Sequence, residues 1–186
     1  MKKLEYPLKF KVSKRAPSKS EMEWLNNWLD SQSWGEDLKV LEFGCGITTW
    51  VINNSLKPSK YYCVEDFKPC INQVKDHVKN VQFISTTWDD IPKEKYDLVF
   101  VDASSCAPKG LVSIIGEGEI VFRDDAIHYV MDFVSDDCFF IVHDWCYRSG
   151  WLRSKWYFEA RNYKLIDSFK KEHGWGVYQK GNFVKS

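Results

Sequence analysis

The sequence lacks several features that would place it in a specialised class of proteins. Its 26 basic residues are balanced by 26 acidic ones, so it presents no broad positive charge to nucleic acid or an anionic membrane. No apolar run approaches the roughly 20 residues that a membrane span needs. The first residues carry charge but neither an apolar core nor a small-residue cleavage site, so we expect no secretory signal.

Cysteine pairs of the metal-binding kind are also missing. The six cysteines include no C-x-x-C pair and no two histidines have zinc spacing, so we expect no structural zinc site. Four cysteines lie in or beside apolar, strand-like runs: Cys45, Cys63, Cys138 and Cys146. We interpret them as reduced, buried side chains of a cytoplasmic globular protein.

Aromatic residues, in contrast, are abundant and make up 16% of the chain. Those of the first helical pattern, Trp24, Trp28 and Trp34, are expected to pack in the core. Trp88, Trp145 and Trp151 instead follow predicted strands, where they could line a pocket.

Short apolar runs alternate with helical patterns along the chain. This alternation predicts an α/β fold in which helices cover both faces of a parallel sheet. The capping-box pattern Ser20-x-x-Glu23 indicates the start of the first helix. We expect a single domain over 1–186, with an irregular basic arm (1–17), an amino-terminal helix (18–34) and a core (36–180). Strands are expected at 38–44, 60–67, 81–85, 96–104, 138–145, 163–171 and 175–180, and helices at 46–56, after Pro69, at 123–135 and at 151–161.

A glycine motif after the first predicted strand carries the strongest functional signal. Its sequence is Glu42-Phe43-Gly44-Cys45-Gly46, and the next residues have a helical pattern. The glycines allow a tight turn and close approach of a ligand, and the free N–H groups of a helix start favour an anionic group. Glu65, 21 residues after Gly44, ends the second strand, where a carboxylate can accept both ribose hydroxyl protons.

Two classes of cofactor share this geometry. A nicotinamide fingerprint would want a third small residue at position 49, which is Thr49 here. An acidic residue in the first strand suits a ligand with an ammonium group, such as the methionine part of S-adenosylmethionine. A glycine turn in an unliganded α/β domain is the structural alternative.

Five segments resemble the successive strand-end motifs of class I S-adenosylmethionine-dependent methyltransferases: VLEFGCGITT, YYCVED, VQFISTTWDD, YDLVFVDAS and CFFIVHDW. The resemblance spans about residues 36–180. It implies a Rossmann-like three-layer sandwich with a seven-stranded, mostly parallel sheet and an antiparallel last strand. It further implies that Glu42, Gly44, Cys45 and Gly46 hold the methionine end, that Glu65 binds the ribose, and that Thr87, Trp88 and Asp89 border the adenine.

The methyl end is less typical of any one subclass. Relatives that methylate amide or base nitrogens often carry an Asn/Asp-Pro-Pro-aromatic motif after strand four, where this chain has Asp102-Ala103-Ser104-Ser105. The arrangement is closer to O-methyltransferases of the catechol type, which hold a divalent cation with an acid after strand four and an Asp-Asn pair after strand five. Asp102 and Asp144 match two of these positions, but Trp145 replaces the Asn. A divalent cation therefore stays open, and we assign no metal ligand.

Four residues are candidates for catalysis. Asp102, or His143 together with Asp144, could act as general base on a hydroxyl, although His143 could equally be a core histidine. Arg123 opens a predicted helix after a loop rich in glycine and proline. It could clamp a substrate carboxylate or form a surface ion pair with a neighbouring aspartate.

The sequence as a whole predicts an S-adenosylmethionine-dependent methyltransferase that acts on an oxygen of a small molecule or sugar. We expect no general nucleic-acid binding and no membrane partner. Two alternatives stay open: a cofactor-binding or structural module that lost the reaction, and a nicotinamide-dependent oxidoreductase. The acceptor and the oligomeric state do not follow from the sequence.

Overall fold

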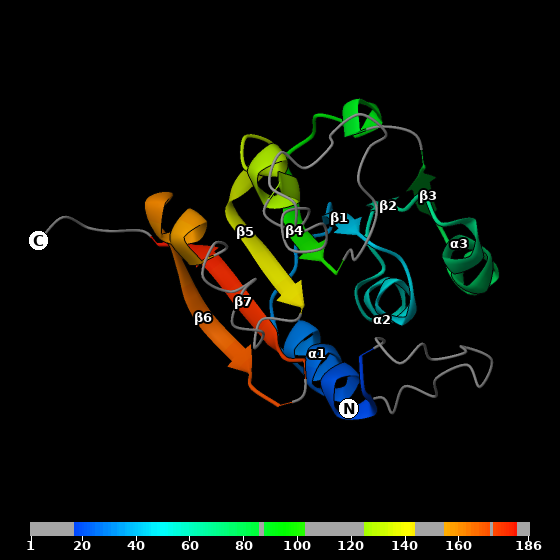
Figure 1. The fold of residues 1–186 in the computed structure, drawn as a ribbon, viewed down its shortest axis with the longest axis horizontal. Helices are drawn as coiled ribbons and strands as arrows, with labels where there is room; N and C mark the ends of the chain where they lie inside the picture. The colour runs from blue at the N-terminus through cyan, green and yellow to red at the C-terminus, as the bar shows by residue number, and fades with distance from the viewer. Residues whose placement is uncertain (1–16, 86–87, 103–124, 144–154, 172, 182–186) are drawn as a thin grey trace, which may run out of the picture.

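A computed structural model describes residues 17–85, 88–102, 125–143, 155–171 and 173–181. They form a seven-stranded sheet in the order β3-β2-β1-β4-β5-β7-β6 (Figure 1). β1 to β5 pair with one another in parallel, and β7 runs antiparallel to β5 and β6. The strands are β1 (Lys39–Phe43), β2 (Lys60–Val64), β3 (Val81–Ile84), β4 (Tyr96–Val101), β5 (Val134–His143), β6 (Tyr163–Phe169) and β7 (Trp175–Lys180).

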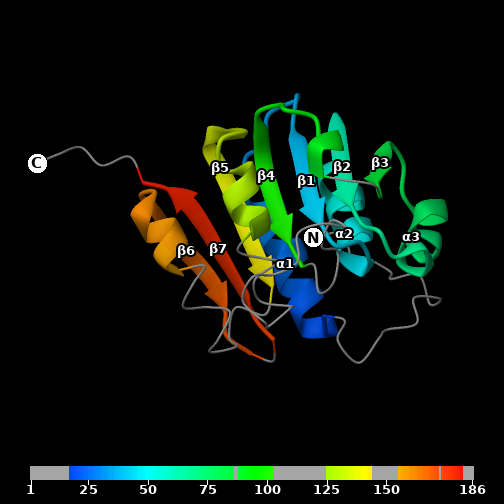
Figure 2. The ribbon, with the colours of Figure 1, turned by 45° about the horizontal axis from the view of Figure 1, so that its top comes forward.

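Helices cover both faces of the sheet, as the alternating pattern predicted. On one face pack α1 (Lys19–Ser31), α2 (Ile47–Leu56) and α3 (Lys68–Val74). Figures 1 and 2 show these three helices together on the same side of the sheet. Short 3-10 turns follow at Lys75–His77 and at Trp88–Asp90. The expected three-layer α/β fold, including the antiparallel last strand, is confirmed.

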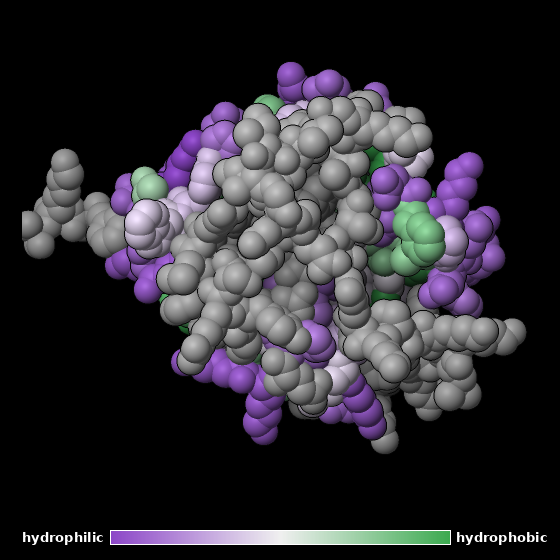
Figure 3. Space-filling view, viewed as in Figure 1, coloured by the Kyte–Doolittle hydropathy of each residue, from purple (hydrophilic) through white to green (hydrophobic). Residues whose placement is uncertain are grey.

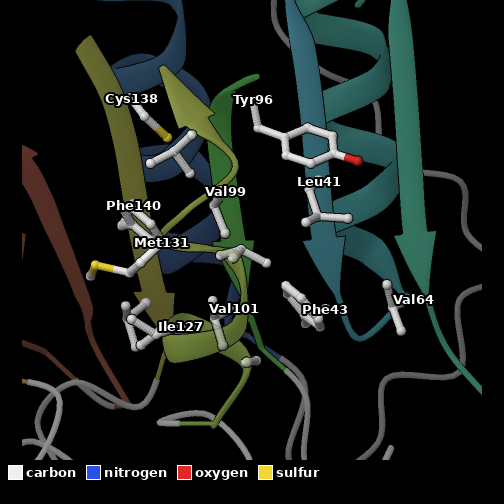
Figure 4. Close-up of a cluster of buried hydrophobic side chains, with 14 of the residues drawn as sticks. Leu41, Phe43, Val64, Tyr96, Val99, Val101, Ile127, Met131, Cys138 and Phe140 are labelled. Atoms are coloured by element: carbon white, nitrogen blue, oxygen red, sulfur yellow. The ribbon is translucent and has the colours of Figure 1, made fainter. Parts of the chain in front are cut away.

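The opposite face buries a second apolar cluster. Helical residues 125–130 place Ile127 and Val130 against strand side chains such as Val99 and Phe140, all of them 0% exposed (Figure 4). Helices on both faces explain why β1 and β4 are buried along almost their whole length, as parallel strands between two helix layers are.

The tryptophans of the amino-terminal segment pack as predicted. Trp28 is 6% exposed, and Trp24 and Trp34 are partly buried against the same cluster. The rings of Trp28 and Trp34 both pack edge-on against Phe139 of β5. Cys63 and Cys138 are buried free thiols, whereas Cys45 is only partly buried.

Several predicted boundaries were wrong, because tertiary contacts decide where an element ends. The first helix ends at Ser31 rather than 34. The second strand ends at Val64 rather than 67, because the Glu65 side chain accepts the N–H of Phe67 and turns the chain. The helix expected to run to about residue 135 stops at 130, and β5 begins at Val134, where Tyr96 of β4 pairs with it.

The capping box that begins α1 is one step earlier than predicted. Ser18, not Ser20, is the N-cap: its Oγ accepts the Glu21 N–H at 3.2 Å, and the Glu21 carboxylate accepts the Ser18 N–H at 2.7 Å. Glu23, the predicted partner, instead forms an exposed ion pair with Lys19.

The visible surface of the described residues is mostly hydrophilic, with small apolar patches (Figure 3). Among the described residues no helix is long and apolar enough to cross a bilayer.

Candidate functional site

The carboxyl ends of the central strands are tied together by backbone hydrogen bonds. Gly44, just after β1, donates to the carbonyl of Val64 at the end of β2. Asp102, just after β4, donates to the carbonyl of Phe43 at the end of β1. Both bonds are 2.9 Å long, so the glycine turn and Asp102 lie at one sheet edge. Ligands of open α/β sheets bind at this edge.

The glycine turn presents open backbone at this edge. Gly44 has a φ of 89°, in the left-handed region that favours glycine. A Cβ placed on Gly46 would meet no atom within 4 Å, so there is open space beside this residue. α2 begins directly after it at Ile47.

Glu65 links the glycine turn to the end of β2. Its Oε2 accepts the backbone N–H of Cys45 at 3.1 Å, and its Oε1 accepts the N–H of Phe67 at 2.8 Å. The side chain is thereby held in one orientation, with the residue only 5% exposed. The two bonds therefore hold the carboxylate between the glycine turn and the end of β2.

Glu42 is fully buried, and its carboxyl group joins three elements. It accepts the hydroxyl of Thr48 in α2 at 2.7 Å and the hydroxyl of Tyr61 in β2 at 2.8 Å. Burial raises the pKa of Glu42 to about 7, although these hydrogen bonds oppose the rise. Glu42 thus links β1 to the first turn of α2 and to β2 by hydrogen bonds. Its predicted contact with the methionine end stays a prediction.

Asp102 and His143 meet at the ends of neighbouring strands. Val101 pairs with Val142 across β4 and β5, so the residues that follow them stand side by side. Nδ1 of His143 lies 2.6 Å from Oδ1 of Asp102. The His143 side chain is 1% exposed and the Asp102 side chain 18%, so the aspartate is the more accessible of the two.

A third member of this group, Glu21, comes from α1. Its Oε1 lies 3.5 Å from Nε2 of His143 and accepts the N–H of Gly174 at 2.7 Å. Figures 1 and 2 show α1 near the carboxyl end of β5. Burial raises the pKa of Glu21, but the facing imidazole of His143 and the hydrogen bonds from the backbone N–H groups of Ser18 and Gly174 outweigh it and lower the pKa to about 2.

Aromatic rings complete the surroundings of His143. The Trp175 ring lies 4.2 Å from the imidazole, between centroids, and the His173 ring lies 5.7 Å from it. His143 and Trp175 are paired residues of β5 and β7, which explains this contact. The imidazole is therefore enclosed by two carboxylates and two rings.

Sequence reasoning missed Glu21. The only signal for it was Ser18-x-x-Glu21, a second capping-box pattern that overlaps the one chosen. Of the other predicted site residues, Asp89 is exposed in the turn Trp88–Asp90, which also contains the backbone of Trp88. Thr87, Arg123 and Asp144 lie outside the described residues, as do Trp145 and Trp151.

Within the described part of the chain, no group of three or more His, Cys, Asp or Glu side chains is arranged to hold a metal ion. Asp144, which matched the second metal position of catechol-type relatives, falls outside that part. A divalent cation at this edge stays an open prediction of the sequence.

Comparison with solved structures places this architecture among known folds, although the sequence matches no family model and no curated protein. An S-adenosylmethionine-dependent O-methyltransferase from Thermotoga maritima is 8% identical, with a TM-score of 0.66 over 93% of this chain and 69% of that one. An rRNA methylase from Streptococcus thermophilus is 11% identical, with a TM-score of 0.62 over 89% of this chain and 99% of that one. A precorrin-6y C5,15-methyltransferase from Geobacter metallireducens GS-15 is 14% identical, with a TM-score of 0.60 over 95% and 100%.

The chain has the fold of the class I methyltransferases. The resemblance seen in the strand-end motifs is thereby confirmed at the level of the fold. The three proteins are named for different acceptors, so their likeness to this chain leaves its acceptor undecided. Within a class I methyltransferase fold, the glycine turn with Glu65 and the group around His143 occupy the edge where this architecture binds ligands.

Proposed function

We propose that this protein is an S-adenosylmethionine-dependent methyltransferase whose acceptor is a hydroxyl group of a small molecule or sugar. The observation that carries the proposal is the Glu65 carboxylate, which is anchored to the glycine turn through Cys45 N–H and to the end of β2 through Phe67 N–H. An ionised carboxylate is an acceptor-only group, which is the chemistry that the hydroxyls of a vicinal diol require. The open space beside Gly46 supports the same assignment.

The residues of the glycine turn would hold the amino-acid end of S-adenosylmethionine, and Glu65 its ribose. When bound, this group supplies a methyl carbon on a positively charged sulfur, which a nucleophile can displace. The protein's main contribution to such a displacement is to hold the acceptor in line and close, which supplies several kcal/mol of the barrier reduction.

Asp102 is the residue that would meet the acceptor. Its carboxylate would accept a hydrogen bond from the acceptor hydroxyl and hold the released proton as the oxygen becomes an ether. A weak base suffices for this step, because a hydroxyl that has gained a methyl group is a strong acid until it loses its proton. His143 faces carboxylates with both ring nitrogens, so we assign it to Asp102 and not to the acceptor.

The charge balance of the chain supports a small acceptor. Its formal net charge is zero, whereas proteins that bind nucleic acid broadly present an excess of Lys and Arg. We accordingly expect no transfer of a methyl group to RNA.

Calorimetric titration with S-adenosylmethionine and S-adenosylhomocysteine tests the cofactor assignment. We expect saturable binding of both, and a loss of at least about tenfold in affinity for Glu65→Ala, since the ribose hydroxyls lose their acceptor. Asp76→Ala, which removes an exposed carboxylate from the 3-10 turn, is the matched control and should bind normally. Absence of binding by the intact protein, or binding of NAD instead, would overturn the proposal.

A second experiment tests the acceptor. The protein is incubated with S-adenosylmethionine that carries a labelled methyl group, together with phenols, sugars, sugar acids or RNA. We expect label on a small hydroxylated compound and none on RNA. Label on RNA would contradict the acceptor class, and binding without transfer to any acceptor would favour the inactive module.

A further inference from the structure

Glu21, His143 and Asp102 bring two carboxyl groups to one imidazole. Its imidazole stands between two carboxylates, at 2.6 Å on the Asp102 side and 3.5 Å on the Glu21 side. A neutral imidazole has one N–H and one lone pair, so it would point a lone pair at one of these carboxylates. A ring that instead presents an N–H to each carboxylate leaves one proton to be shared along the short contact between His143 and Asp102.

Two arrangements of that proton are chemically distinct. In the first, Nδ1 of His143 carries it, the ring is an imidazolium and Asp102 is a carboxylate. In the second, Asp102 is a neutral acid that donates to a neutral ring. The total charge is the same, so surrounding groups decide between the two arrangements.

The charge of Glu21 favours one of these two positions of the proton. It is 0% exposed, and two backbone N–H groups, those of Ser18 and Gly174, hold its two oxygens in place. Its pKa of about 2 means that it keeps its negative charge throughout the neutral range. A fixed negative charge beside Nε2 favours a positive ring, and in this buried surrounding it is weakly screened.

Among the described residues, two further rings lie close to the imidazole. The Trp175 ring lies 4.2 Å from the imidazole between centroids, tilted by 34°, and an aromatic ring attracts a cation. His173 is the nearest further titratable ring, at 5.7 Å from the imidazole. It is only partly buried, so water screens any charge that it carries.

We propose that Glu21 is a positioning residue that, through His143, keeps Asp102 an ionised and oriented carboxylate toward the acceptor. This inference rests on the proposed function for the role of Asp102, but the charge state that it assigns belongs to the protein alone. Glu21 does not contact the acceptor. It lies at Nε2 of the imidazole, whereas Asp102 lies at Nδ1, so its effect on Asp102 passes through the ring. The acceptor group that such a carboxylate takes is a hydrogen-bond donor, which fits a hydroxyl.

The side-chain ¹⁵N spectrum of the histidines tests the charge state without any ligand. The chain has four histidines, and the spectrum of His143→Gln assigns the signals of His143 by their loss. At pH 7.5 we expect both ring nitrogens of His143 to show the shifts of protonated nitrogens. A signal from an unprotonated ring nitrogen in the wild type would overturn the proposal, whatever the variants do.

The variants at position 21 separate charge from structure. Glu21→Gln removes the charge and should convert His143 to a ring with one unprotonated nitrogen, whereas Glu21→Asp keeps the charge and should restore the doubly protonated ring. Ser18→Ala removes the side-chain cap of α1 without touching the carboxylate, so it should leave the His143 signals unchanged while it lowers stability. An unchanged His143 spectrum in folded Glu21→Gln would refute the assignment.

Kinetics with the acceptor from the labelling screen give the functional readout. We expect Glu21→Gln to lower kcat at least tenfold and to leave the affinity for S-adenosylmethionine within about twofold of the wild type. A loss of stability alone would change neither parameter in the folded fraction. If S-adenosylmethionine fails to bind the wild type while the spectrum is as expected, the proposed function fails and the Glu21–His143 relationship stands.

Discussion

Nδ1 of His143 and Oδ1 of Asp102 lie 2.6 Å apart at the carboxyl ends of β5 and β4. The distance follows from the register of the sheet, in which Val142 and Val101 are direct neighbours. Because the same edge also carries the glycine turn, the contact sits next to the place where a class I methyltransferase fold binds ligands. Residues whose charges are tuned by burial and by a specific partner are candidates for function.

Asp102 can be tested separately from cofactor binding. We expect Asp102→Asn to lower kcat at least about 100-fold, because the amide cannot hold the proton of the acceptor hydroxyl. Binding of S-adenosylhomocysteine should stay within about twofold of the wild type, since Glu65 and the glycine turn are intact. Parallel loss of binding and turnover would assign Asp102 to the architecture of the site rather than to the reaction.

The amino-terminal cap offers a matched pair of serines. Ser18→Ala should lower the free energy of unfolding by about 1 kcal/mol, because the Glu21 N–H at the start of α1 loses its acceptor. Ser20→Ala should change it by less than about 0.5 kcal/mol, since Ser20 is not the cap. Urea titration of the two variants measures the difference. Equal effects would mean that the cap is shared between the two serines.

Glu42 should give stability an unusual pH dependence. Its folded pKa of about 7 lies above the ordinary value of 4.5, so the folded state binds a proton that the unfolded state has lost. Stability from this group is therefore full below pH 4.5 and is lost as the pH rises through about 7. Between pH 5 and 8 the wild type should lose about 2 kcal/mol relative to Glu42→Gln.

Urea titrations at the two pH values give this comparison. Glu21 does not interfere, because its pKa of about 2 places its own titration below the window. A constant difference between the wild type and Glu42→Gln at both pH values would contradict a raised pKa for Glu42.

Cys45 provides a chemical probe of the glycine turn. It is partly buried and its N–H is held by Glu65, whereas Cys63 and Cys138 are 0% exposed, and burial raises the pKa of both of these thiols well above the usual range. A maleimide should therefore label Cys45 in the folded protein and leave the other two unmodified. S-adenosylhomocysteine should slow labelling of Cys45 several-fold, as peptide mapping by mass spectrometry would show. Equal rates with and without the ligand would place its site away from the turn.

Much of the architecture could be predicted because it depends on local patterns. The predicted bounds of β7 are those of the structure. The predicted bounds of α2 are within one residue of the structure, because a glycine and a proline flank that helix closely. The end of the helix before β5 could not be predicted in this way. The apolar residues around Met131 and Val134 continue a helical period, but pairing with β4 draws the second of them into a strand.

In the candidate site, too, some features could be predicted from local patterns and others depend on tertiary contacts. Gly44 and Glu65 could be found because each directly follows a short apolar strand, and a parallel sheet brings such positions to one edge. Glu42 matched the expected motif, but its hydrogen bonds to Thr48 and Tyr61 appear only when β1, α2 and β2 are assembled.

The sequence by itself determined the three-layer α/β plan, the glycine turn and the acidic residues at the ends of the strands. These follow from periodicity and from residue types with few conformational alternatives. Only the tertiary structure decided that Glu21 faces His143. Glu21 and Gly174, which hydrogen-bond each other, are 153 positions apart, and no local pattern specifies how α1 docks on the sheet. The packing of apolar faces determines that docking. As a result the carboxylate of Glu21, which caps α1, is buried next to the imidazole of His143.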